Sequence, residues 1–233
     1  MGAATTLMRH QFPDVGGLFD TLNGEFKQQF PASHKSKWIQ ILYDGINHWL
    51  VAGYGFPCMP EGTICIYDSK VKDGIPNPLV VSCCASILKT QKDTIRILTT
   101  SVQQQSRDDC GWYAIAFATT LLHGHDPRKF CYEPKKFSNH FKKCLRERKL
   151  TSFPFCSATR SPTLRNEETS VIPVCCSCRR PEKLRNHSSA INWTAQCDVC
   201  QEWFHEECQD IPVEAKQIDF PWSCKSCKER MLR

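Results

Sequence analysis

The amino-acid sequence predicts an α+β domain followed by a small cysteine-rich module. Residues 1–157 contain strand-like runs that Gly and Pro separate, together with apolar helical patterns. Apolar periodicity stops after residue 157, and cysteines crowd together from residue 173 onward. We therefore divide the chain into a first domain at 1–157, a linker at 158–172 and a second domain at 173–230.

The first domain is expected to be a sheet covered by helices. Runs rich in Ile, Val and aromatic residues predict strands at 38–43, 48–54 and 63–67, and alternation predicts another at 94–98. Helices are expected at 79–88 and 110–122, and the spacing of Phe137, Phe141 and Cys144 predicts an amphipathic helix at about 133–148. Ser, Thr, Arg, Asn and Glu dominate 158–172, which is typical of a solvated linker.

Composition limits the class of protein. The chain has 233 residues, of which 41% are hydrophobic and 23% charged, a balance typical of globular proteins. The apolar run near 112–122 is too short to span a bilayer. The first residues lack the features of a secretory signal, and Met1-Gly2 with Thr6 fits a myristoylation pattern only loosely. Sixteen cysteines, many in C-x2-C pairs, therefore indicate metal ligands in a reducing compartment.

Cys110 is the candidate nucleophile, because it begins the helix expected at 110–122. The free N–H groups at a helix N-terminus stabilise a thiolate. Gly111 follows directly, and glycine inside a helix indicates that another group approaches the backbone closely. We expect Asp108 and Asp109 to cap this helix, and the other seven cysteines before residue 157 to be core residues.

A thiol is mostly protonated at neutral pH and needs a base. His48 lies where one predicted strand begins, and Asp68 follows the end of the next. If these strands are antiparallel neighbours, the two side chains lie at the same edge of the sheet. Gln104, on the loop before Cys110, could aim its amide at an oxyanion, with Gln103 and Gln105 as alternatives.

The order His48, Asp68, Gln104, Cys110, together with the runs His48-Trp49 and Tyr67-Asp68-Ser69, resembles the Ulp/SENP-type ubiquitin-like-protein protease family over about residues 12–155. This resemblance implies a papain-like (Ulp/adenain-type) fold and a thiol peptidase in which His48 is the base, Asp68 orients it, Cys110 attacks and Gln104 builds the oxyanion hole. Trp49 would flank the channel that admits the Gly-Gly tail of a modifier such as SUMO. The family usually carries a longer helical segment at the front, whereas only a stub precedes Trp38 here.

The C-terminal cysteines are spaced as zinc ligands. Four pairs of soft ligands suit two tetrahedral zinc ions, and they are Cys176 with Cys178, Cys197 with Cys200, His205 with Cys208, and Cys224 with Cys227. Cys175 competes with Cys176 as the first ligand, because Cys175-x2-Cys178 is also a workable spacing. A domain this small cannot rely on an apolar core, so zinc is expected to supply its folding free energy.

This segment resembles a PHD finger, on the runs Trp203-Phe204-His205 and Trp222-Ser223-Cys224. The resemblance implies interleaved ligands, with the 176, 178, 205 and 208 positions on one ion and the 197, 200, 224 and 227 positions on the other. It also implies binding of a histone tail or another peptide. Trp203 and Trp193 are the candidate peptide-binding residues, and a purely structural module is the alternative.

The formal charge of +6 overstates how basic the chain is. Two zinc ions add four charges and seven thiolates remove seven, which leaves about +3. The basic residues from Lys135 to Lys149 are accordingly expected to form a solvated helix face, and nucleic acid is not an expected partner.

Together these patterns predict a nuclear or nucleo-cytoplasmic enzyme that cleaves after the Gly-Gly tail of a ubiquitin-like modifier or its conjugates. Two alternatives remain open, a chromatin reader with an idle protease domain and a polyprotein-processing protease derived from a mobile element.

Overall fold

The computed structural model describes residues 1–22, 30–69, 77–102, 109–156, 167–175, 177, 181, 194–205, 208–216 and 220–231. The chain forms two compact units. The first comprises Met1–Leu88 with Arg96–Ser170, and the second comprises Lys89–Ile95 with Val171–Arg233. Each unit is described by itself below.

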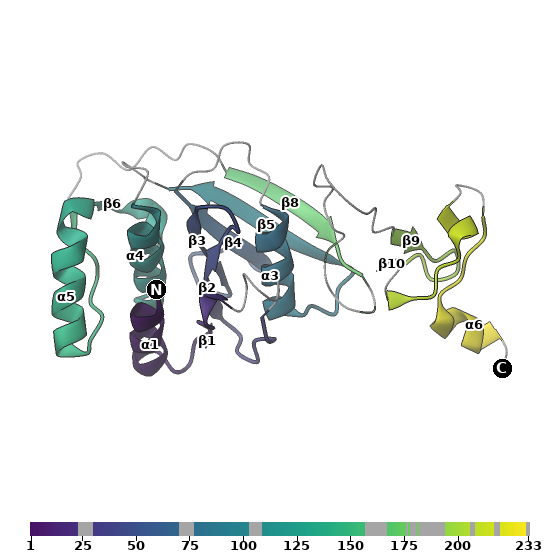
Figure 1. Cartoon of the computed structure of the whole chain (residues 1–233), viewed down its shortest axis with the longest axis horizontal. Coiled ribbons are helices and arrows are strands. Elements are labelled where there is room, and N and C mark those ends of the chain that lie inside the picture. The colour runs from purple at the N-terminus through teal and green to yellow at the C-terminus, as the bar shows by residue number, and fades with distance from the viewer. Residues whose placement is uncertain are drawn as a thin grey trace. The chain divides into compact units, whose positions relative to one another are not determined.

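A mixed sheet forms the centre of the first unit (Figure 1). Its strand order is β1-β2-β3-β4-β5-β8. Strands β2, β3 and β4 are antiparallel neighbours, whereas β1 is parallel to β2 and β5 is parallel to β4. The strands are β1 (Gly16–Gly17), β2 (Trp38–Tyr43), β3 (Trp49–Tyr54), β4 (Thr63–Asp68), β5 (Thr94–Ser101) and β8 (Glu167–Pro173).

Four α-helices belong to the described part of this unit. They are α1 (Gly2–Gln11), α3 (Pro78–Leu88), α4 (Cys110–Leu122) and α5 (Phe137–Glu147). Helix α4 packs on β3 and β2 and contacts α1, and Figure 1 shows α3 on the other side of the sheet. Short elements complete the unit: η1 (Pro127–Lys129), η2 (Pro134–Lys136), and the paired strands β6 (Cys131–Tyr132) and β7 (Phe155–Cys156).

Both faces of the central strands are buried, which explains their largely apolar sequences. Ile41, Val51 and Tyr67 belong to the same core cluster as the residues of α4. Their strand neighbours Leu42 and Ile66 point to the opposite face and are also buried. The core thus continues through the sheet and fixes the position of α4, the helix that carries Cys110.

The structure differs from the sequence predictions at three places. Helix α1 occupies the front segment, where Ala4 and Met8 are four residues apart and fully buried. The amphipathic helix begins at Phe137, because Pro134 opens a separate 3-10 turn. Part of the expected linker, Glu167–Pro173, is strand β8 at the edge of the sheet.

The described part of the second unit has little regular structure. Strands β9 (Thr194–Gln196) and β10 (Trp203–His205) form an antiparallel hairpin, followed by η4 (Val213–Lys216) and α6 (Lys225–Met231). Phe204 and Trp222 meet edge to face, with ring centroids 5.6 Å apart, and pack with cysteines in a small core. Segment 89–95 also belongs to this unit, and the Val174 N–H donates to the Asp93 carbonyl at 2.8 Å.

None of the helices in the described ranges combines the length and apolar character needed to cross a membrane.

Candidate active site and metal centres

The imidazole of His48 and the carboxylate of Asp68 are hydrogen-bonded. His48 directly precedes β3, and Asp68 ends the neighbouring antiparallel strand β4. The Nε2 atom of His48 lies 2.6 Å from Oδ1 of Asp68, and His48 is buried. Because a carboxylate accepts hydrogen bonds, Nε2 carries the proton in this pair. With Nε2 bonded to Asp68, Nδ1 is the ring nitrogen that remains to act as a general base.

The turn that carries His48 is organised by Asp44, which sequence reasoning missed. Its Oδ1 atom accepts the backbone N–H groups of Ile46, Asn47 and His48 at 2.9, 3.0 and 2.9 Å. The Asp44 N–H donates to the His48 carbonyl at 2.9 Å. The available signal was the pair Asp44-Gly45 between two predicted strands, which is typical of a hairpin turn.

Cys110 is the first residue of α4 and is buried. A Cβ atom placed on Gly111 would lie 3.7 Å from Cδ1 of Trp49, so the Trp49 ring lies beside the start of α4. Trp49 follows His48 in the chain, and Gly111 follows Cys110. The packing of α4 on β3 thus places the Trp49 ring, which follows His48 in the chain, beside the residue that follows Cys110.

Other predicted residues of this site have different outcomes. Asp109 occupies the N-cap position of α4, but its side chain makes no capping hydrogen bond. The prediction that this carboxylate caps the helix is therefore wrong. The Asp109 carbonyl instead accepts the Tyr113 N–H at 3.0 Å. Gln104 and Asp108 lie outside the described residues.

The remaining cysteines of the first unit are not all core residues. Cys65, Cys83, Cys84 and Cys144 are buried, as the sequence predicts. Cys156 is exposed, because it lies in the two-residue strand β7, both residues of which face solvent. Burial raises the pKa of the Cys65 and Cys83 thiols to about 12, which makes them poor nucleophiles.

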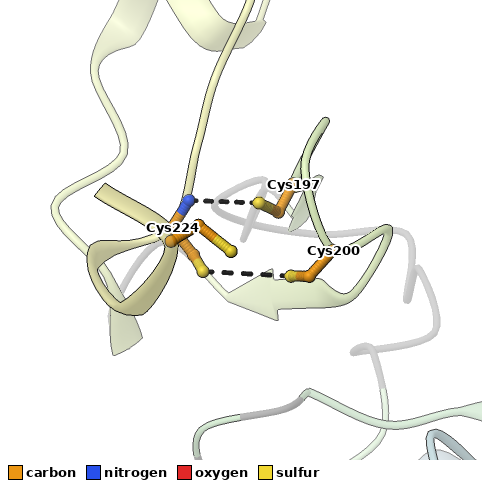
Figure 2. Close-up of side chains that lie close together, drawn as sticks. Cys197, Cys200 and Cys224 are labelled. Atoms are coloured by element: carbon orange, nitrogen blue, oxygen red, sulfur yellow. Dashed lines mark hydrogen bonds between the residues drawn. The ribbon is translucent and has the colours of Figure 1, made fainter. Parts of the chain in front are cut away.

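Four sulfurs gather in the second unit. The Sγ atoms of Cys197, Cys200, Cys224 and Cys227 all lie within 4.8 Å of one another. Figure 2 shows three of these side chains pointing toward one another, with the Cys224 N–H donating to Cys197 Sγ at 3.3 Å. Cys200 and Cys224 approach from separate segments, and their sulfurs lie 3.9 Å apart.

This geometry fits a tetrahedral zinc ion. Four thiolates at a Zn–S distance of about 2.3 Å have sulfurs about 3.8 Å apart, close to the separation between Cys200 and Cys224. Burial opposes ionisation of Cys197, but backbone N–H groups at its sulfur lower its pKa to about 6. The cluster could thus hold a metal ion, and its donors are those that zinc prefers.

A second cluster contains Cys175, His205 and Cys208, whose ligand atoms also lie within 4.8 Å of one another. The Nδ1 atom of His205 faces Cys208 Sγ at 3.9 Å. Its Nε2 atom lies 3.1 Å from the Pro181 carbonyl, which accepts a hydrogen bond from that nitrogen. This backbone contact orients the ring so that Nδ1 faces the cluster, as carbonyl partners of histidine ligands commonly do.

Cys176 and Cys178 lie outside the described residues. Among the described cysteines, Cys175 is the one that joins His205 and Cys208, and the His205 N–H donates to its sulfur at 3.5 Å. Of the predicted peptide-binding residues, Trp203 is 39% exposed on β10, and Trp193 lies outside the described residues.

No family model matches the chain. A segment of 57 residues is 30% identical to the Set1 complex component spp1 of Schizosaccharomyces pombe. The match covers 24% of this chain and 12% of the length of that protein. The similarity is thus confined to a short stretch, although it links part of this chain to a component of the Set1 complex.

Proposed function

We propose that this protein is a cysteine peptidase that cleaves after the Gly-Gly tail of a ubiquitin-like modifier. The observation that supports the proposal is the 2.6 Å contact between His48 Nε2 and Asp68 Oδ1, together with the Trp49 ring beside Gly111, the residue after Cys110. The proposed papain-like arrangement places the nucleophile on a helix and its base on the adjoining sheet. The resemblance to the Ulp/SENP family supplies the substrate class.

The proposed reaction is an acyl transfer. Nδ1 of His48 takes the proton of Cys110, and the thiolate attacks the carbonyl carbon of the terminal glycine. The oxyanion forms near the free N–H groups at the start of α4, where the amide of Gln104 is proposed to assist. The leaving amine takes the proton from His48, and water then hydrolyses the thioester.

The test is labelling of the full chain by a vinyl-sulfone probe built on a ubiquitin-like protein. We expect labelling by at least one member of a panel of Gly-Gly-tailed modifiers, and its loss in Cys110→Ala. Cys156→Ala is the matched control, since it removes an exposed thiol outside the site and should leave labelling unchanged. Asp68→Ala should slow labelling roughly a hundredfold, the scale of general-base assistance.

Wild-type protein that is folded but labelled by no modifier would refute the peptidase proposal. A polyprotein peptide cut by the same protein would instead favour the processing protease. The alternative function is a chromatin reader with an idle protease domain, and the similarity to a Set1 complex component favours that class. It predicts peptide binding without any Cys110-dependent labelling.

We propose that the second unit is a PHD-type module with two structural zinc ions. Cys197, Cys200, Cys224 and Cys227 would bind one ion. His205, Cys208, Cys178 and Cys175 would bind the other. Cys175 replaces Cys176 in this set because its sulfur lies with His205 and Cys208.

The exposed Trp203 would contribute to the surface that binds a histone tail or another peptide. A nuclear location is proposed on the similarity to a Set1 complex component.

A further inference from the structure

The outward face of α5 carries cations in two rows that differ in their neighbours. The opposite face is buried, because Phe137 and Cys144 lie in the core and Phe141 packs against Trp112 with ring centroids 5.8 Å apart. The basic side chains of this segment are all exposed. They therefore present their charge to solvent along a helix about 16 Å long.

One row is electrically neutral, and we call it the paired row. Lys136 lies 2.8 Å from Glu133, and Lys143 lies 3.8 Å from Glu147. Lys136, Lys143 and Glu147 are spaced by seven and four residues, so they follow one side of the helix. Both acidic residues of the segment 133–149 are used in these two pairs.

The second row, which we call the outer row, consists of Lys135, Lys142, Arg146 and Lys149. Lys142 and Arg146 are four residues apart on α5, so they lie on one side of the helix. Lys135 lies in η2 before the helix, and Lys149 follows its C-cap residue Arg148. Among the residues that the structure describes, none of these four cations has a carboxylate partner. The structure thus divides the basic residues of this segment into cations with carboxylate partners and cations without them, which the sequence alone does not distinguish.

The charge and composition of the outer row indicate which class of partner it can bind. A membrane surface requires a free apolar face beside the cations, and the apolar face of α5 is buried in the protein. Protein interfaces carry an apolar or aromatic centre that is depleted in charge, whereas the outer row contains only Lys and Arg. Four exposed cations without carboxylate partners, with Leu145 as the one exposed large apolar side chain of α5, suit the negative charge of a phosphate backbone.

We propose that the outer row of α5 binds the phosphate backbone of nucleic acid without reading its sequence. The outer row shares no residue with the proposed peptidase and peptide-binding sites, and it would hold the protein on a polyanion during either activity. The modest net charge does not oppose the proposal, because binding depends on the local density of unpaired cations.

The test measures binding of the full, zinc-loaded chain to a fluorescent 20-base-pair DNA duplex by anisotropy between 50 and 200 mM salt. Four phosphate contacts predict a slope of about −3.6 in log K against log salt, so affinity should fall roughly 150-fold across this range. K142Q/R146Q removes two contacts and should leave a slope of about −1.8, or a roughly 12-fold fall. The same measurement with a single-stranded RNA shows whether the protein prefers DNA or RNA.

Two variants make the test specific. K35Q/R96Q removes the same net charge at exposed positions away from α5, and it should retain the wild-type slope. E133Q/E147Q frees Lys136 and Lys143 from their partners, and it should tighten binding and steepen the slope. Circular dichroism confirms that each variant is folded.

Equal losses in K142Q/R146Q and K35Q/R96Q would overturn the proposal, because they would show a response to net charge alone. Absence of DNA and RNA binding at 50 mM salt would overturn it as well. Tighter binding of polyglutamate than of either nucleic acid would also overturn it, in favour of an acidic protein partner.

Discussion

The turn that precedes His48 offers a sharp test of how the proposed base is held. Asp44→Ala removes the oxygen that accepts three consecutive backbone N–H groups. A hydrogen bond to a charged group contributes about 1.5–3 kcal/mol when it is buried, but Ile46 and Asn47 are exposed and their N–H groups regain water. The His48 N–H lies in a buried residue and does not, so we expect a loss of about 1–2 kcal/mol in the free energy of unfolding.

The same substitution should slow the reaction of Cys110. Without the Asp44 acceptor, the turn no longer fixes the start of β3, and the imidazole samples orientations in which Nδ1 misses the thiol. A cost of about 1.4 kcal/mol in productive orientation corresponds to a roughly tenfold slower reaction with the vinyl-sulfone probe. An asparagine side chain at this position retains an acceptor oxygen without the charge, so Asp44→Asn should recover most of the labelling rate.

The assay combines urea unfolding with probe labelling across pH. Asp20→Ala is the matched control, because Asp20 accepts one backbone N–H, from Leu22 at 3.1 Å, instead of three. Its effect on stability should be a few tenths of a kcal/mol, and labelling should not change. Unchanged stability and labelling in folded Asp44→Ala would refute the role assigned to the turn.

Three further predictions concern the metal clusters and the buried thiols. Chelation of zinc should unfold the second unit and leave the first folded, so hydrogen exchange should accelerate at the amides of β9 and β10 but not at those of β2 to β4. Cys175→Ser should lower the zinc content of the full chain from two ions to about one, whereas Cys176→Ser should retain both. Metal analysis of the purified variants measures this, and loss of zinc in Cys176→Ser alone would contradict the prediction. Because burial raises the pKa of Cys65 from 9.0 to about 12, the folded state holds this proton more tightly than the unfolded chain, and the free energy of unfolding should fall as pH rises from 9 toward 12. Urea unfolding at about pH 8 and about pH 10.5 should show this fall, and Cys65→Ala should reduce it.

Much of the first unit could be predicted because its signals are local. The strand at 38–43 is apolar except for Gln40, and the strand at 63–68 is apolar from Ile64 to Tyr67. The helix at 110–122 begins and ends where its apolar residues do. Helix α1 was missed because it has few strongly apolar residues, and its burial depends on contact with α4. Strand β8 was missed because its residues are mostly exposed and polar, so its structure depends on pairing at the sheet edge.

The residues of the candidate active site also include some that the sequence predicted and one that it missed. Sequence spacing pointed to His48 and Asp68, and the antiparallel pairing of β3 with β4 brings their side chains into contact. Asp44 makes its contacts through backbone N–H groups, and such bonds leave only the weak signature of a turn.

The sequence by itself determined the central strands and the helices α3, α4 and α5, where the soft metal donors lie, and which residue types form a thiol, imidazole and carboxylate set. These properties follow from side-chain chemistry and from the periods of the helix and strand. Only the tertiary structure decided that Cys175 lies with His205, and that the cations of α5 separate into a paired and an unpaired row. Consecutive side chains on an extended chain point to opposite faces, so the fold decides which of two neighbouring cysteines faces His205. A lysine on a helix pairs with a carboxylate only where the three-dimensional arrangement brings the two charges together.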